Sequence, residues 1–318
     1  MSEIAIGIDI GGTNSRFGVV TDSGKVLKED RFPTNEFPKA EDYVKALSTR
    51  ISGVLDDYTD YTFKGIGIGA PNGNFFKGTI EQAPNLPWKG FIPLVDLFKQ
   101  YFAVPVVLTN DANAASIGEK IFGGAKNIQD FILITLGTGL GSGIVVNGDV
   151  VYGHDGFAGE MGHVSLDVDE GRTCGCGQKG CLETYASAQG IKRTVFELLA
   201  AENPNSMLNE YSFSTMTSEH IYRAAREGDA IALKAFDLTG KYLGAKLADA
   251  VAYTSPKAIF LYGGLAKSGK FILDPTRKYF EQHVMPIFKG KVSIVLSELS
   301  GKHGAILGSA ALVWKKRK

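Results

Sequence analysis

Three cysteines and one histidine lie close together in the middle of the chain. His163 is followed by Cys174, Cys176 and Cys181, and glycines separate the cysteines. Three thiolates and one imidazole match the four-coordinate ligand set of structural zinc. The alternative is a reduced, glycine-rich loop, because the spacing H-x10-C-x-C-x4-C differs from that of common zinc fingers. Since the glycines would let the backbone wrap an ion, we favour a zinc site without an open position.

Two glycine turns follow strand-like segments and could hold phosphate. Asp9-Ile10-Gly11-Gly12-Thr13-Asn14 ends an alternating apolar segment, and Gly137-Thr138-Gly139 follows the apolar run at 131–136. Glycine lets several backbone N–H groups approach phosphate oxygens without a Cβ in the way. Asp9 could hold Mg²⁺ directly or through water. Each turn alone is typical of an ordinary tight turn, but two at matching positions favour phosphate binding.

A third glycine pair, Gly263-Gly264, follows an expected strand at 258–262 and could let an adenosine lie against the backbone. Other phosphate motifs are absent from the sequence. It contains neither the P-loop pattern nor the H-R-D and D-F-G set of protein kinases. The second glycine turn also lacks the G-x-G-x-x-G spacing of dinucleotide-binding folds.

One carboxylate, Asp111, stands between an expected strand at 104–108 and an expected helix at 112–122. Aspartate is favoured as a helix N-cap, which is the purely structural interpretation. The functional interpretation is a base that accepts the proton of a substrate hydroxyl during phosphoryl transfer. The two are compatible, because a capping position also fixes the carboxylate.

The pattern of expected elements repeats within the chain. Strand, Gly/Thr turn and strand occur near the N-terminus and again near residue 131, and helical spacing marks residues 40–55, a helix from about Asp229, and residues 304–314. We expect an α/β protein with two lobes of similar topology that face each other across a cleft. Such interfaces are favoured ligand sites.

The motif Asp9-Ile10-Gly11-Gly12-Thr13, followed by Arg16, resembles the first phosphate motif of the ROK family of sugar kinases and sugar-responsive repressors. The likeness extends over essentially the whole chain and includes the cysteine cluster, with Glu183 two residues after its last cysteine. It implies the two-lobed actin/hexokinase/Hsp70-like ATPase fold of duplicated ribonuclease H-like domains. We expect a small lobe of residues 1–118 and 301–318, and a large lobe of residues 119–300.

The resemblance also implies roles for individual residues. Asp111 would be the catalytic base. The sugar would contact Asn110, Asp111, Glu160, His163 and Glu183, and, from the first lobe, Asn72, Gly73 and Asn85, although Asn85 also suits a turn in a Pro-rich loop. ATP with Mg²⁺ would contact Asp9, Gly11, Gly12, Thr13, Asn14, Gly137, Thr138, Gly139, Gly263 and Gly264. If one nitrogen of His163 binds zinc, the orientation of the other is fixed.

Composition narrows the class of protein further. The 34 basic residues balance 34 acidic ones, which argues against a surface built for nucleic acid or membrane. The sequence shows no apolar run of membrane-spanning length and no secretory signal, so we expect a cytoplasmic protein with reduced thiols. The balanced charge and a phosphate hairpin that begins at Ile4 count against the repressor branch. The resemblance suggests a homodimer.

We therefore expect a glucokinase-like sugar kinase that transfers phosphate from ATP to carbon 6 of glucose. Fructose, mannose, N-acetylglucosamine and N-acetylmannosamine remain alternative substrates, and polyphosphate remains an alternative donor. A non-catalytic sugar-sensing regulator is the rival from another class. A zinc hydrolase is disfavoured, because four protein ligands leave no open metal position.

Overall fold

The computed structural model describes residues 2–202, 205–299, 301 and 303–315. The chain divides into two units. The first consists of Met1–Asn127, Gly148–Ala158 and Gly301–Lys318, and the second of Ile128–Asn147 and Gly159–Ser300. The chain thus enters the first unit three times. The expected break after residue 118 falls inside a helix, and the structure divides after Asn127 instead.

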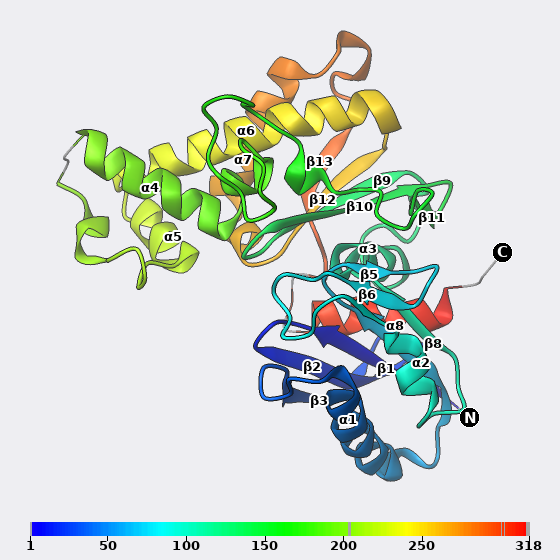
Figure 1. The fold of residues 1–318 in the computed structure, drawn as a ribbon. Coiled ribbons are helices and arrows are strands. Elements are labelled where there is room, and N and C mark those ends of the chain that lie inside the picture. Colours follow the sequence, from blue (N-terminus) through cyan, green and yellow to red (C-terminus); the bar gives the residue numbers. More distant parts are fainter. Residues whose placement is uncertain (1, 203–204, 300, 302, 316–318) are drawn as a thin grey trace. The chain divides into compact units, whose positions relative to one another are not determined.

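The first unit is built on a five-stranded sheet (Figure 1). Its strands lie in the order β3-β2-β1-β4-β8, where the first two pairs are antiparallel and β1, β4 and β8 run parallel. The strands are β1 (Glu3–Ile10), β2 (Asn14–Thr21), β3 (Val26–Pro33), β4 (Thr62–Gly69) and β8 (Val106–Thr109). A small sheet consists of β5 (Gly73–Asn74), β6 (Thr79–Glu81) and β7 (Phe91–Ile92). The short strand β11 (Asp149–Val150) does not belong to this small sheet and follows the Asn147-Gly148 turn.

Helices cover both faces of this sheet because its central strand is apolar on both sides. The isoleucines of β1 at positions 4, 6, 8 and 10 are buried in one core with α1 (Ala40–Leu55) and α2 (Leu94–Lys99). On the other face Ala5 packs with Ile306 and Ala310 of α8 (Gly304–Trp314). The helix α3 (Asp111–Ile121) contacts α8, and η1 (Asp56–Tyr58) extends α1.

The second unit repeats this arrangement of strands. It contains β10 (Leu140–Val146), β9 (Phe131–Leu136), β12 (Ala258–Tyr262) and β13 (Ser293–Leu296), neighbouring in that order. As in β1 and β2, the hairpin of β9 and β10 is antiparallel, and β9 pairs in parallel with a later strand. This recurrence confirms the α/β architecture with a repeated strand pattern.

Helices complete the second unit. Its core joins this sheet to α4 (Ala188–Glu202), α5 (Ser218–Arg226), α6 (Ala230–Thr254) and α7 (Lys270–His283). Asp229 caps α6 by accepting a hydrogen bond from the Ala232 N–H, and the helix therefore begins next to Asp229, as expected. The short helices are η2 (Met161–His163), η3 (Leu182–Thr184), η4 (Met207–Glu210), η5 (Leu265–Ser268) and η6 (Pro286–Phe288). Among the residues that the structure describes, no helix has the length and apolarity needed to cross a bilayer.

Candidate functional site

The parallel strands of the first unit bring three predicted regions to one edge of the sheet. Asp9 of β1 lies in register with Gly69 of β4, and Gly69 lies in register with Thr109 of β8. All three residues stand at the carboxyl ends of their strands, where open α/β sheets bind ligands. Asn110 and Asp111 follow Thr109 directly. The sheet therefore gathers the predicted magnesium ligand and the predicted base on the same edge.

The start of α3 orients Asp111. Asn110 has extended backbone angles and is the N-cap, and its side-chain oxygen accepts a hydrogen bond of 2.8 Å from the Ala112 N–H. Asp111 is the first helical residue, and its Oδ1 also accepts from Ala112, at 2.9 Å. The purely structural interpretation of Asp111 as N-cap is thus corrected, because Asn110 holds that position.

The charge of Asp111 acts on the carboxyl group of Asp9. Burial and then the negative charge of Asp111 raise the pKa of Asp9 to about 6, and the positive charge of Arg16 acts in the opposite direction. Loss of hydration among neighbouring protein atoms also raises the pKa of Asp111, although part of the residue is reached by solvent. Arg16 itself is held by an ion pair with Glu29. A cation bound here would relieve the repulsion between Asp9 and Asp111.

The first glycine turn packs against a predicted sugar loop. A Cβ on Gly12 would stand 2.3 Å from the backbone oxygen of Asn85, so only glycine allows this approach. The carbonyl of Thr13 accepts hydrogen bonds from the N–H groups of Thr34 and Asn35, and the Thr13 side chain is exposed. These hydrogen bonds anchor the turn, and Thr13 remains exposed to solvent.

Some polar groups of the loop after β4 form hydrogen bonds within the loop itself. Asn72 has a left-handed backbone, with φ of 50°, and its amide nitrogen donates to the carbonyl of Glu81 at 3.0 Å. Gly73 donates its N–H to Ala70 and packs closely on the carbonyl of Thr109. Asn72 and Gly73 thus lie beside the end of β8.

In the second unit the glycine turn between β9 and β10 is held at both ends. Gly137 donates its N–H to the carbonyl of Gly139, and its own carbonyl accepts from the N–H of Ala188 at the start of α4. Thr138 is exposed at the tip of the turn. Gly263, at the end of β12, packs against the backbone of Leu136 immediately before the turn. Both glycine motifs predicted to bind the nucleotide in this unit are therefore neighbours, and Gly264 follows, exposed.

The predicted zinc ligands converge. The ligand atoms of His163, Cys174, Cys176 and Cys181 all lie within 4.8 Å of one another. The sulfurs of Cys176 and Cys181 are 3.7 Å apart, and Nδ1 of His163 is 3.7 Å from the sulfur of Cys174. Bonds of about 2.3 Å to a tetrahedral zinc would separate two sulfurs by roughly 3.8 Å. The four side chains therefore fit a tetrahedral metal, and all three cysteines are free of disulfides.

The two glutamates predicted to contact sugar stand on either side of this cluster in the sequence. Glu160 is exposed and directly precedes η2, which carries His163. Glu183 lies on η3, and one of its carboxylate oxygens accepts a hydrogen bond of 2.9 Å from the N–H of Leu140. Its other oxygen lies 3.8 Å from the sulfur of Cys174. Glu183 thus touches both the cysteine cluster and the end of the glycine turn.

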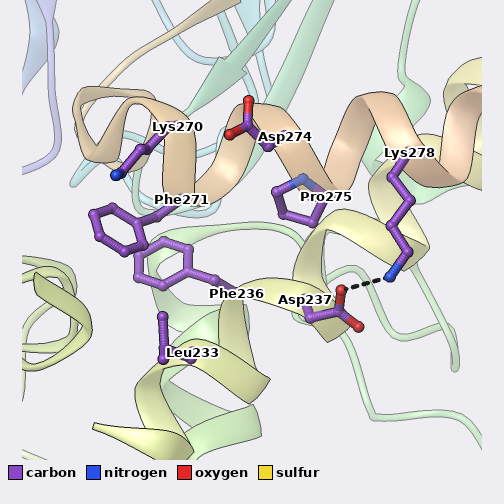
Figure 2. A pocket seen from close by; sticks show the side chains of 8 residues that line it. All are labelled: Leu233, Phe236, Asp237, Lys270, Phe271, Asp274, Pro275 and Lys278. Carbon is purple, nitrogen blue, oxygen red and sulfur yellow. Dashed lines mark hydrogen bonds and ion pairs between the residues drawn. The ribbon is translucent and has the colours of Figure 1, made fainter. Parts of the chain in front are cut away.

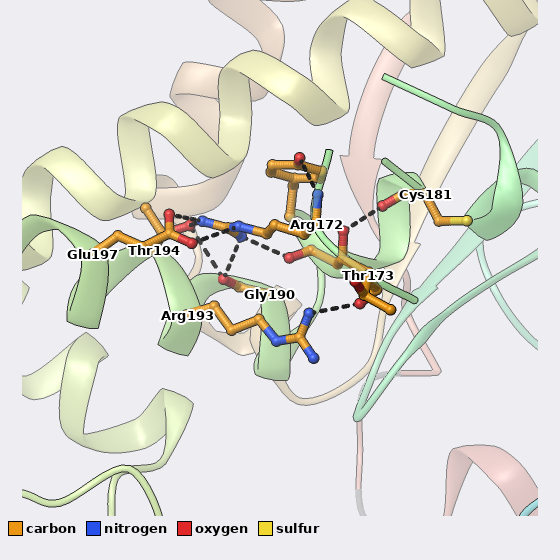
Figure 3. A network of polar contacts seen from close by, with 9 residues as sticks. Arg172, Thr173, Cys181, Gly190, Arg193, Thr194 and Glu197 are labelled. Atoms are coloured by element: carbon orange, nitrogen blue, oxygen red, sulfur yellow. Dashed lines mark hydrogen bonds and ion pairs between the residues drawn. The ribbon is translucent and has the colours of Figure 1, made fainter. Parts of the chain in front are cut away.

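Sequence reasoning missed the residue that anchors the cysteine loop, Arg172. Its guanidinium forms an ion pair with Glu197, donates to the carbonyl of Thr184 at 2.6 Å, and stacks on the ring of Tyr185 at 4.4 Å (Figure 3). Arg193 adds a hydrogen bond of 3.0 Å to the carbonyl of Thr173. These contacts tie the loop to α4. A single arginine near the cysteines gave no signal in the sequence, because its partners lie up to 25 residues away.

A pocket outside the predicted site also went unnoticed in the sequence. It is a groove of about 510 Å³ between α6 and α7, with the rings of Phe236 and Phe271 near one end and the ion pair of Lys278 with Asp237 near the other (Figure 2). None of its lining residues belongs to the predicted site.

Known proteins are similar to this chain in sequence and in fold. A family model described as ROK family matches residues 5–316. The chain belongs to the ROK family. A glucokinase from Halalkalibacterium halodurans is 34% identical over 313 residues, which cover 95% of this chain and 93% of that protein. The crystal structure of a ROK family glucokinase from Streptomyces griseus, in complex with glucose and AMPPNP, is 35% identical, covers 98% of this chain and 100% of that one, and has a TM-score of 0.83.

The ROK family also contains regulators that resemble this chain. The xylose repressor of Bacillus spizizenii is 29% identical over 316 residues, which cover 97% of this chain and 76% of the repressor. Identity is nevertheless higher to the glucokinases, over nearly their full length. The chain is accordingly a glucokinase-like member of the ROK family with the actin/hexokinase-like ATPase fold.

Proposed function

We propose that this protein phosphorylates a hexose with ATP, and that its preferred reaction converts glucose to glucose 6-phosphate. The observation that carries the proposal is the strand edge that brings Asp9 and Asp111 within electrostatic reach of each other. Phosphoryl transfer needs a carboxylate to orient the attacking hydroxyl and a cation to neutralise the phosphates. Similarity to glucokinases supports glucose as the acceptor.

Asp111 is the proposed general base. Its Oδ1 is engaged by the Ala112 N–H, which leaves the other oxygen to accept the proton of the sugar hydroxyl as that hydroxyl attacks the terminal phosphorus. The raised pKa makes Asp111 a stronger proton acceptor once it is ionised. Asn110, fixed as the helix cap, would contact the same sugar through its amide nitrogen.

ATP is the proposed donor, with Mg²⁺ held beside Asp9. Magnesium prefers carboxylate and water oxygens, and it would also stabilise the ionised form of Asp9. The phosphates would contact backbone N–H groups and hydroxyls of Gly11, Gly12, Thr13, Asn14, Gly137, Thr138 and Gly139, and the adenosine would lie on Gly263 and Gly264. The exposure of Thr13 and Thr138 supports this assignment, since a ligand can reach both residues.

We also propose a structural zinc ion held by His163, Cys174, Cys176 and Cys181. The metal would supply no reaction step, and would instead fix the shape of the loop. Because Nδ1 of His163 faces the cysteines, its Nε2 would point to a sugar hydroxyl. Glu160 and Glu183 would contact the sugar from the second unit, and Asn72, Gly73 and Asn85 from the first.

A screen of ADP release tests the proposed function. Purified protein, ATP and Mg²⁺ would be incubated with glucose, fructose, mannose, N-acetylglucosamine and N-acetylmannosamine, and ADP would be measured by an enzyme-coupled assay. We expect the highest kcat/KM for glucose. Polyphosphate in place of ATP tests the donor. Failure of all five sugars to stimulate ADP release would overturn the kinase assignment.

A sugar-sensing regulator is the second candidate, because a xylose repressor resembles this chain over 97% of its length. Binding to random duplex DNA at low salt distinguishes the two, since even non-specific DNA binding is detectable there. We expect no binding. We further propose a homodimer in the cytoplasm, and light scattering on purified protein gives its mass directly.

A further inference from the structure

Glu183 connects two parts of the second unit to which different functions are assigned. On one side lies the cysteine loop, and on the other the glycine turn between β9 and β10. One carboxylate oxygen accepts the N–H of Leu140 at 2.9 Å, and the other lies 3.8 Å from the sulfur of Cys174. The residue is partly buried, so water competes only partly for these contacts.

The carboxylate of Glu183 lies very close to the backbone of Gly139 in this turn. A Cβ on Gly139 would stand 2.1 Å from the Leu140-bound oxygen of Glu183, well inside van der Waals contact. The backbone of Gly139 is outside the left-handed region, so its conformation alone would accept alanine. A side chain at position 139 would therefore have to displace the carboxylate of Glu183 from its place beside Leu140.

The position of Glu183 is set by the cysteine loop. It lies two residues after Cys181, and the hydroxyl of the next residue, Thr184, donates to the Cys181 carbonyl at 2.7 Å. Arg172, shown in Figure 3, donates to the carbonyl of Thr184 at 2.6 Å. The short helix η3 thus has little freedom to move relative to the cysteines.

We propose that Glu183 is a positioning residue for the second glycine turn, through which the cysteine loop holds that turn in the conformation that binds nucleotide phosphate. The proposal rests on the proposed function in one respect, the assignment of this turn to the nucleotide. It differs from the sugar contact expected from the family, because it predicts an effect on nucleotide binding when no sugar is present.

Two opposing effects of Glu183 can be separated by substitution. Its hydrogen bond orders the turn, while its negative charge repels phosphate. Glu183→Gln keeps an oxygen that accepts from Leu140 and removes the charge, whereas Glu183→Ala removes both. If positioning dominates, the alanine variant binds nucleotide more weakly and the glutamine variant binds at least as well as the wild type. If repulsion dominates, both variants bind more tightly.

The test is calorimetric titration of ADP with Mg²⁺ into the full-length protein without sugar. We expect about a tenfold rise in Kd for Glu183→Ala, in line with the loss of a hydrogen bond to a charged group. No rise is expected for Glu183→Gln or for the control Glu219→Ala, whose carboxylate is exposed on α5. Metal content of all variants should equal that of the wild type, because Glu183 is outside the ligand set.

A double-mutant cycle adds a readout that a general loss of structure would not give. Gly139→Ala should weaken ADP binding strongly in the wild type, where the new methyl meets Glu183, and less in the Glu183→Ala background, where that space is open. Additive effects, or an alanine variant that binds ADP as well as the wild type, would overturn the proposal. Wild-type protein that binds no ADP and phosphorylates no sugar would instead refute the proposed function.

Discussion

Asp9 at the end of β1 and Asp111 at the start of α3 are electrostatically coupled across the carboxyl edge of one parallel sheet. Burial is the larger cause of the raised pKa of Asp9, and the charge of Asp111 adds to it. Two carboxylates on one edge cost free energy in the folded protein. Natural proteins keep such arrangements where a cation or a proton transfer needs them.

The stability of the protein should therefore depend on the protonation of Asp9. Its pKa rises from 3.8 to about 6 on folding, so between these values the folded chain keeps a proton that the unfolded chain has lost. This contribution to the free energy of unfolding is fully present below pH 4 and is lost as the pH rises through about 6. The shift corresponds to at most about 3 kcal/mol.

Urea unfolding of the wild type and Asp9→Asn, at pH 4 and at pH 7, measures this effect. From pH 4 to pH 7 the wild type should lose the contribution of Asp9 to the free energy of unfolding, whereas Asp9→Asn has no such contribution to lose. The free energy of unfolding of Asp9→Asn relative to the wild type should therefore be higher at pH 7 than at pH 4. The exposed control Asp60→Asn should show little change of this kind. Equal pH dependence in the wild type and Asp9→Asn would show that Asp9 titrates alike in the folded and unfolded chain.

A buried chain of hydroxyls supports the first glycine turn. Tyr43 donates to the hydroxyl of Ser15 at 2.6 Å, and Ser15 also bonds the hydroxyl of Thr34, whose N–H donates to Thr13. Burial raises the pKa of Tyr43, so its hydroxyl stays protonated as a donor. Tyr43→Phe should lower the free energy of unfolding by about 1 kcal/mol. Ser15→Ala should cost more in a urea titration, because it leaves two buried hydroxyls without this partner.

The geometry of the cysteine cluster predicts the metal content of the purified protein. Purified protein should contain about one zinc per chain by mass spectrometry of the metal, and Cys176→Ser should lower this content and the melting temperature together. His154→Ala, which removes an exposed histidine outside the cluster, should leave both unchanged. Wild-type protein without metal would contradict the zinc assignment.

Much of the framework follows from the sequence because it depends on local pattern. The spacing of apolar residues predicts α1 over residues 40–55, as observed, and the alternation of isoleucines predicts β1. The repeated strand–turn–strand pattern predicts the two sheets. The convergence of His163 with the three cysteines follows from ligand chemistry, which needs four donors at one point.

Other features depend on contacts that local pattern does not encode. α7 went unpredicted because it contains Pro275, which interrupts helical spacing in the sequence although the helix accommodates it. Both Asn110 and Asp111 are good capping residues, and only the extended backbone of Asn110 decides between them. The contact of Glu183 with Leu140 joins residues 43 apart and has no signature in either segment.

The catalytic role of Asp111 is the central claim, and Asp111→Asn tests it most directly. Asparagine preserves the size of the side chain and an oxygen for the Ala112 N–H, but it is a far weaker proton acceptor. Turnover of glucose should fall by roughly 10²–10⁴-fold, while the Kd for glucose, measured by calorimetry, changes little. Turnover within a few-fold of the wild type, at unchanged glucose affinity, would contradict the assignment of Asp111 as the base.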